Sequence, residues 1–128
     1  MNPVGDEAVS GKIGEMLVQL RLLLHSIQAA PPILDSGNDL IALKGRVIKS
    51  IQVKTRKFET QNWNIRSTDR DYDIIALVEL AQNSEKLDEA KIYLLSKDDL
   101  RGRVSSISPS VIEDRLLFEN QIESLFGR

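Results

Sequence analysis

Apolar residues recur every three to four positions from residue 6 to about residue 28, which is the spacing of one face of an α-helix. The main stripe consists of Val9, Ile13, Met16, Leu17, Leu20, Leu23, Leu24 and Ile27. A second apolar patch, formed by Gly14, Val18 and Leu22, predicts that this helix is buried on more than one side. Ala29–Pro32 is expected to end the helix, because neither proline can continue it.

Two apolar runs, residues 40–43 and 47–53, flank Lys44-Gly45-Arg46 and predict a β-hairpin. Glycine at the first position of a two-residue loop suits a type II′ turn, so we expect Gly45-Arg46 to be the loop. The residues then expected to lie opposite each other are Leu43 and Ile48, Ile41 and Ser50, and Asp39 and Gln52. Alternation keeps Lys54 on the face of Gln52, diagonally about 7–8 Å from Asp39. One face of the open end therefore carries a carboxylate, an amide oxygen and an ammonium.

The continuous apolar run at residues 72–80 is typical of a central strand covered on both faces. A polar connection at residues 81–89 leads to a short partner strand, residues 91–95, after which Ser96 can cap one helical turn. The last helix is expected to open at Ser110, which has capping-box spacing to Glu113. Its apolar side would comprise Val111, Ile112, Leu116, Leu117, Ile122, Leu125 and Phe126. Residues 58–68 show no helical stripe and predict an irregular loop, or a short strand near residues 63–66.

These elements predict an α/β (α+β) fold with an N-terminal helix, a central mixed β-sheet of about four to five strands, and a C-terminal helix. A chain of 128 residues can bury one core, so we expect a single domain spanning residues 1–128. The absence of cysteine excludes disulfides and thiolate metal sites and suits a reducing compartment. No apolar run reaches the roughly 18 residues of a membrane span, and the N-terminus does not resemble a signal peptide, so a cytoplasmic location is expected.

A helix bearing Gly14-Glu15, a strand beginning at Asp39 and a strand bearing Gln52-Val53-Lys54 follow one another in this order. This order resembles the PD-(D/E)XK nuclease superfamily, in the variant that replaces the second acid by glutamine. The resemblance covers roughly residues 9 to 95 and is closest to small homing-endonuclease-like, resolvase-like and Mrr-like members. It implies the restriction-endonuclease-like fold. Asn38 stands where the common signature has a proline.

The resemblance implies a metal-dependent DNA endonuclease, commonly a homodimer, that hydrolyses phosphodiester bonds with Mg²⁺ or Mn²⁺ as the cofactor. Asp39 would bind the ion through its carboxylate, Gln52 through its amide oxygen, and Val53 through its carbonyl. Lys54 would orient or deprotonate the attacking water, and Glu15 would bind a second ion or a metal-bound water. Oxygen ligands suit Mg²⁺, and the neutral Gln52 should weaken metal affinity relative to a carboxylate.

DNA contact must be local, because the chain carries a net charge of −2 whereas nucleic-acid binders usually show a basic bias. The segment after Lys54 is the candidate surface, with Arg56, Lys57, Arg66 and Arg70 on phosphates and Trp63 against a base or sugar. A solvated connection pinned by Trp63 is the alternative interpretation of this segment.

For several residues the sequence allows a structural role as well as a functional one. Glu15 lies away from the main stripe and is either solvated or directed at a site. Asp35 is treated as a turn former, Asp73 either lies near the site or caps a turn, and His25 is given no role. For the whole chain, the alternatives are a catalytically inactive nuclease-fold module that binds DNA or protein, or a plain α/β structural domain.

Overall fold

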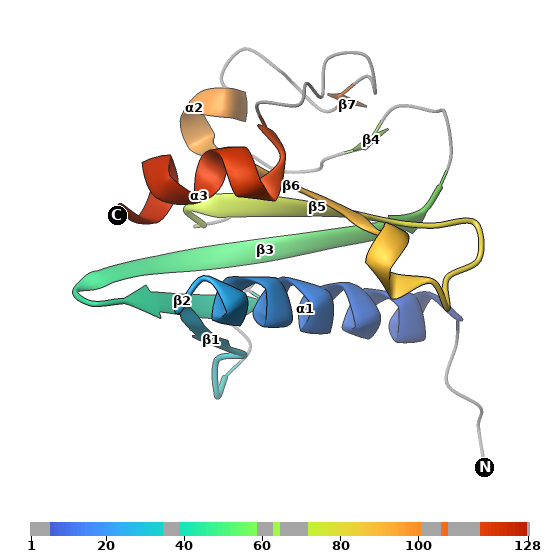
Figure 1. Cartoon of the computed structure of the whole chain (residues 1–128), viewed down its shortest axis with the longest axis horizontal. Coiled ribbons are helices and arrows are strands. Elements are labelled where there is room, and N and C mark those ends of the chain that lie inside the picture. Colours follow the sequence, from blue (N-terminus) through green and yellow to red (C-terminus); the bar gives the residue numbers. More distant parts are fainter. Residues whose placement is uncertain are drawn as a thin grey trace.

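The computed structural model describes residues 6–34, 39–58, 63–64, 72–100, 106–107 and 116–127. Its elements, shown in Figure 1, are α1 (Asp6–Leu24), β1 (Gln28–Ala30), β2 (Leu40–Lys44), β3 (Val47–Lys57), β4 (Trp63–Asn64), β5 (Ile74–Leu80), the 3₁₀ turn η1 (Leu87–Glu89), β6 (Lys91–Ser96), α2 (Lys97–Leu100), β7 (Ser106–Ile107) and α3 (Phe118–Phe126). The predicted α+β architecture is confirmed: an N-terminal helix, a mixed sheet and a C-terminal helix.

The main sheet has five strands in the order β1-β2-β3-β5-β6. The pair β3–β5 is parallel and the other pairs are antiparallel. Six of the seven residues of β5 are buried, as predicted for a central strand, and β6 is the expected partner strand. The short strands β4 and β7 pair with each other in a separate two-stranded sheet.

The register of the predicted hairpin is confirmed. Leu43 pairs with Ile48 and Ile41 with Ser50, and the Lys44–Val47 pair leaves Gly45-Arg46 as the loop. Gly45 has a φ of 59°. Arg46, the second loop residue, does not have a positive φ, because Ser26 is the one non-glycine residue in the described part of the chain that does. A positive φ at the first loop position alone is what a type II′ turn requires.

Helix α1 ends at Leu24 and not near residue 28 as predicted. Ser26 adopts a φ of 62°, and its N–H donates to the Leu23 carbonyl over 2.9 Å, while the Ile27 N–H donates to the Leu22 carbonyl over 3.0 Å. These paired bonds form a Schellman motif, which closes the helix at a left-handed residue. Gln28–Ala30 then forms the edge strand β1 against β2. The sequence did not predict this strand, because Ile27 continues the helical spacing of apolar residues.

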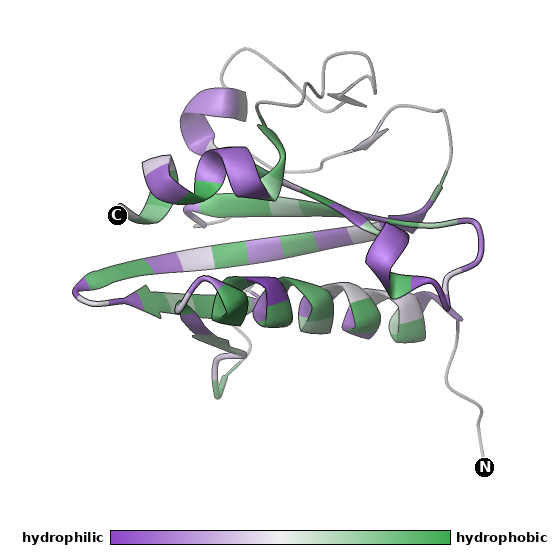
Figure 2. Cartoon of the chain, viewed as in Figure 1, coloured by the Kyte–Doolittle hydropathy of each residue, from purple (hydrophilic) through white to green (hydrophobic). Residues whose placement is uncertain are grey.

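The expectation that α1 is buried on more than one side is wrong for the described residues. Its buried positions are those of the smaller patch, Gly14, Val18 and Leu22. The members of the main stripe that remain exposed are Val9, Met16, Leu20, Leu23 and Leu24. Figure 2 shows hydrophobic residues along the whole length of α1 as well as on the strands. None of the described helices is long and apolar enough to cross a membrane.

The core lies on both faces of the main sheet. One cluster packs α1 and α3 against the strands through residues such as Val18, Ile51, Ala76 and Phe118. The other contains Trp63, Tyr72, Ile75, Leu77, Leu95 and Leu116. Helices α1 and α3 also meet directly, because the Arg21 guanidinium lies 2.6 Å from the Glu119 carboxylate.

The two predicted helix caps differ in outcome. At α2, the Asp99 N–H donates to the Ser96 hydroxyl over 3.2 Å and the Ser96 N–H donates back to the Asp99 carboxylate over 2.9 Å, which confirms the Ser96 cap. The predicted helix start at Ser110 and Glu113 lies outside the described residues. The described part of the last helix buries Phe118, Ile122 and Phe126.

Candidate functional site

The site begins with an unusually close contact between α1 and β3. A Cβ atom added to Gly14 would lie 1.8 Å from the Thr55 hydroxyl oxygen and 2.9 Å from the Thr55 Cβ, whereas one added to Gly11 would meet nothing within 4 Å. Only a residue without a side chain allows the helix backbone to approach the strand this closely. The contact places Glu15, the next residue along α1, beside β3.

Asp39 lies where β2 begins, at the point where β3 extends beyond its partner. The last β2–β3 pair is Leu40 with Ile51, and β3 continues to Lys57. The Asp39 N–H donates to the Ile51 carbonyl over 3.0 Å, and the Asp39 Oδ2 accepts a hydrogen bond from the Val53 N–H over 2.7 Å. The Asp39 carboxylate is therefore fixed against the part of β3 that has no β2 residue opposite it.

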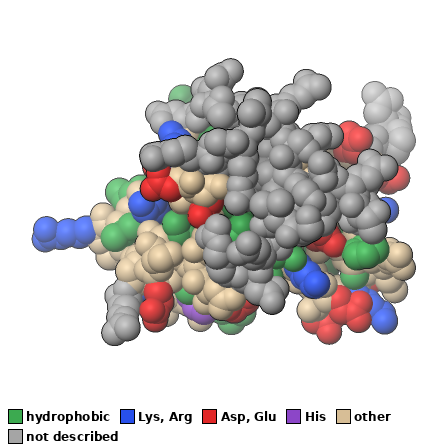
Figure 3. All heavy atoms as spheres, turned by 90° about the horizontal axis from the view of Figure 1, so that it is seen from above, with side chains coloured by type: hydrophobic (Ala, Val, Ile, Leu, Met, Phe, Trp, Pro, Cys, Tyr) green, Lys and Arg blue, Asp and Glu red, His purple; other side chains and the backbone are tan. Residues whose placement is uncertain are grey.

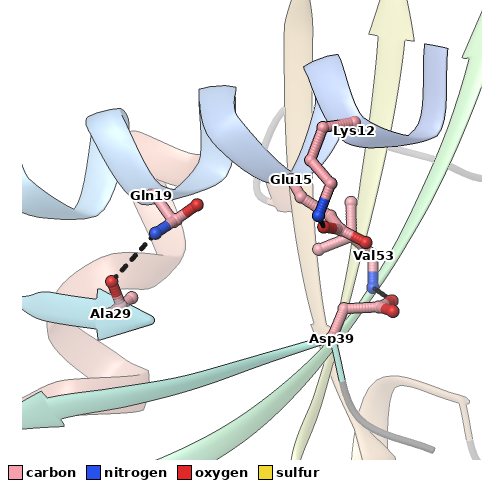
Figure 4. A network of polar contacts seen from close by, with 6 residues as sticks. All are labelled: Lys12, Glu15, Gln19, Ala29, Asp39 and Val53. Atoms are coloured by element: carbon pink, nitrogen blue, oxygen red, sulfur yellow. Dashed lines mark hydrogen bonds and ion pairs between the residues drawn. The ribbon is translucent and has the colours of Figure 1, made fainter. Parts of the chain in front are cut away.

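Lys12 and Glu15 complete a polar cluster with Asp39 and Val53. The Lys12 ammonium donates to the Glu15 carboxylate over 2.8 Å. Figure 4 shows the side chains of Lys12 and Glu15 projecting from α1 toward Val53 and the Asp39 carboxylate, while Gln19 bonds to the Ala29 carbonyl further along the helix. The hydrogen bond and the charge of Glu15 raise the pKa of Lys12, and the charge of Asp39 acts in the same direction.

Gln52 and Lys54 project from the other face of β3. Ile51 and Val53 belong to the core on the α1 side, so alternation directs their neighbours away from α1. Gln52 is 4% exposed and is the one buried polar side chain in the described ranges. Its Oε1 is buried and has no hydrogen-bond partner among the described residues, as is the case for the Thr55 hydroxyl oxygen on the same strand, whereas buried polar atoms usually have such a partner. Lys54 is half-buried.

The oxygen atoms present suit a hard divalent cation. Asp39 and Glu15 offer carboxylates and Gln52 offers an amide oxygen, which are the ligand types that Mg²⁺ prefers. No group of three or more His, Cys, Asp or Glu residues gathers within the described residues. A metal site here would therefore combine two carboxylates with neutral oxygens. The meeting of all four predicted residues around one ion stays a prediction.

Arg56 and Trp63, both predicted to contact DNA, pack against each other. The Arg56 guanidinium carbon lies 4.0 Å from the centroid of the Trp63 ring and its terminal nitrogen 3.8 Å from the Glu79 carboxylate. Trp63 is 4% exposed, so this arrangement favours the interpretation in which Trp63 pins the connection. Lys57 is exposed, and its contact with phosphate stays a prediction. Arg66 and Arg70 lie outside the described residues, as does Asp35.

The remaining residues that the sequence singled out, Asp73 and His25, make contacts within the fold. The Asp73 carboxylate accepts hydrogen bonds from the Ser50 N–H over 2.9 Å and the Ser50 hydroxyl over 3.3 Å, which fixes the start of β5 against β3. The His25 ring lies 5.3 Å from the Phe118 ring. Sequence reasoning missed Lys12, although its spacing of three residues from Glu15 is that of an ion pair on one helix face.

The chain is thus an α+β protein in which a helix lies across a mixed sheet and the Glu15 and Asp39 carboxylates lie where the hairpin opens. Among solved structures, a bacterial homing endonuclease, I-Ssp6803I, has a similar fold, with a TM-score of 0.59 over 81% of this chain and 75% of that chain. The two sequences are 23% identical, so the similarity shows the fold alone. No family model and no curated protein matches the sequence.

Proposed function

We propose that this protein is a metal-dependent DNA endonuclease that hydrolyses phosphodiester bonds with Mg²⁺ or Mn²⁺. The observation that carries the proposal is the position of the Asp39 and Glu15 carboxylates beside the part of β3 that extends past its last pair with β2. The fold similarity to a homing endonuclease supports the same class of reaction.

Each residue has a defined role in this proposal. Asp39, Gln52, Glu15 and the Val53 carbonyl would hold the ion, which would polarise the scissile phosphate and the attacking water. The Val53 N–H donates to one Asp39 oxygen, which holds the carboxylate beside β3, where it would serve as a ligand of the ion. Lys54 would orient or deprotonate the attacking water and stabilise negative charge that develops on the phosphoryl oxygens.

The protein would bind DNA through one local surface and act as a cytoplasmic homodimer that cuts both strands. On the face visible in Figure 3, the described acidic and basic side chains are interspersed and do not form a basic patch. We therefore expect weak, local attraction to phosphates. Among the described residues, the exposed Lys57 is the candidate for this contact. The absence of cysteine suits the reducing cytoplasm.

The decisive experiment is a cleavage assay on a mixed panel of duplex, branched and single-stranded DNA in Mg²⁺, Mn²⁺, Ca²⁺ or a chelator. We expect cleavage of at least one substrate in Mg²⁺ or Mn²⁺, and none in the chelator. Asp39→Asn and Lys54→Met should abolish it, whereas Lys49→Met, on the same strand, should not. Asparagine is preferred to alanine because its amide oxygen can still accept the Val53 N–H. A folded parental protein that cuts no substrate, or an Asp39→Asn variant that cuts at the parental rate, would refute the proposal.

The second candidate is a catalytically inactive nuclease-fold module that binds DNA or protein. Two observations favour it: Gln52 is neutral, and the Lys12 ammonium offsets the charge of Glu15. Calorimetry separates the two functions, because the inactive module should bind DNA without cleavage and release or absorb no heat on addition of Mn²⁺.

A further inference from the structure

Lys12 places a positive charge among the carboxylates beside the end of β3. Its ammonium donates to the Glu15 carboxylate over 2.8 Å, and both side chains project from α1 toward Val53 and the Asp39 carboxylate (Figure 4). The Val53 N–H holds that second carboxylate beside β3. Lys12 therefore lies next to both acidic groups that the proposed function assigns to a divalent ion, although the sequence gave it no role.

The Lys12 side chain is also accessible to a ligand that arrives from solvent. It is 62% exposed, whereas the Glu15 side chain that it contacts is only 20% exposed. An exposed ion pair contributes little to stability, and the lysine ammonium is carried on a flexible four-carbon stem. The ammonium can therefore leave Glu15 at little cost and contact another anion nearby.

Lys12 and Lys54 approach the end of β3 from opposite sides. Lys54 projects from the face of β3 that is turned away from α1, whereas Lys12 extends from α1 itself. Lysine ammonium groups commonly bind phosphate as point charges. A DNA strand that lies against this end of β3 would therefore have a cation available on each side of the strand.

We propose that Lys12 is a phosphate-binding residue that becomes available to DNA when Glu15 binds a divalent ion. Without the ion, Glu15 holds the Lys12 ammonium, and the neighbouring Asp39 carboxylate repels phosphate. Once the charge of Glu15 is directed at the ion, the ammonium binds the phosphodiester backbone instead. Binding of metal and of DNA would then be coupled through this one side chain. The inference rests on the proposed function and adds to it a DNA contact that depends on the metal.

The first experiment measures DNA affinity and requires no cleavage. Binding of a fluorescent DNA duplex would be measured over a range of salt concentrations, in saturating Ca²⁺ and in a chelator. In Ca²⁺ we expect Lys12→Met to reduce the slope of log affinity against log salt by about 1, whereas in the chelator the slope should be nearly unchanged. Lys86→Met is the matched control, because Lys86 forms an exposed ion pair with Glu89 at the same spacing. It should leave the slope nearly unchanged in both conditions.

A second set of variants frees the ammonium without a metal. In the chelator, Glu15→Gln should raise DNA affinity more in the parental background than in the Lys12→Met background. The loss of one negative charge is common to both backgrounds, so the difference between the two gains isolates the released ammonium. Circular dichroism of each variant confirms that the fold is retained.

A Lys12→Met variant that binds DNA in Ca²⁺ as tightly as the parental chain, or that loses affinity equally in Ca²⁺ and in the chelator, would overturn the proposal. Equal gains from Glu15→Gln in the two backgrounds would also overturn it. If the parental chain nevertheless cuts DNA in Mg²⁺, only the role of Lys12 fails and the nuclease function stands. A parental chain that neither cuts DNA nor binds it more tightly in Ca²⁺ would refute both.

Discussion

Two glycines three residues apart on one helix have opposite physical roles. A methyl group on Gly14 would collide with Thr55, whereas one on Gly11 would extend into open space. We expect Gly14→Ala to lower the free energy of unfolding by about 1–3 kcal/mol through overpacking. Gly11→Ala should raise it by about 0.5–1 kcal/mol, because alanine loses less entropy in a helix. Denaturant unfolding of both variants checks this, and equal effects would show that α1 does not rest on β3 as described.

Lys12 would compete with a divalent ion for the Glu15 carboxylate. The Lys12 ammonium lies 2.8 Å from the Glu15 carboxylate and offsets the negative charge that would attract a cation. If Glu15 helps to hold the ion, Lys12→Met should therefore strengthen Mn²⁺ binding in calorimetry. Lys86→Met is the matched control, because Lys86 forms an exposed ion pair with Glu89 at the same sequence spacing. Stronger binding in both variants would indicate a general charge effect.

Asp39 accepts a hydrogen bond from Val53 and is also a proposed metal ligand. A substitution should therefore test the two roles separately. Asp39→Ala would leave the partly buried Val53 N–H without its acceptor, at a cost of about 1–3 kcal/mol in unfolding free energy. Asp39→Asn should retain most of that stability and still lose metal binding. Thermal unfolding together with Mn²⁺ titration distinguishes the two effects, and an equally large loss of stability in both variants would contradict this account.

At the scale of elements, the end of α1 offers a stabilising substitution. Ser26 occupies the left-handed position of a Schellman motif, where glycine is preferred because it has no Cβ. We expect Ser26→Gly to raise the free energy of unfolding by about 1 kcal/mol, measured by chemical denaturation. Gly45→Ala is the converse control, since Gly45 also has a positive φ and its replacement should destabilise the hairpin.

The elements that could be predicted from the sequence are those specified by local chemistry. The Gly45-Arg46 loop follows from turn preferences, and alternation from that loop then determines the register that places Asp39 near Gln52. The buried face of α1 could not be predicted in this way, because a larger apolar stripe competes with Gly14, Val18 and Leu22. Only the sheet decides which face packs, and the contact of Gly14 with Thr55 is a tertiary feature. The stacking of Arg56 on Trp63 is likewise a contact between segments that no local pattern specifies.

At the scale of the whole molecule, net charge limits how the proposed nuclease could bind DNA. A net charge of −2 provides no general attraction, so the proposed binding would depend on a few cations. The structure changes which cations are suitable for testing this. Arg56 packs against Trp63, and the Lys44 ammonium donates to the Gly127 carbonyl, so substituting either would disturb packing as well as charge. Lys57 near the site and Arg46 at the hairpin tip are both exposed and form a cleaner pair.

If Lys57 contacts a phosphate, Lys57→Glu should weaken DNA binding similarly on all sequences and reduce the slope of log affinity against log salt by about 1. Arg46→Glu introduces the same change in net charge at the end of the hairpin away from the proposed site, so it should leave the slope nearly unchanged. Binding would be measured over a range of salt concentrations in Ca²⁺, chosen to prevent cleavage. Equal losses of affinity in the two variants would mean that DNA binding depends on the overall charge of the protein. The end of β3 would then not be the DNA-binding surface.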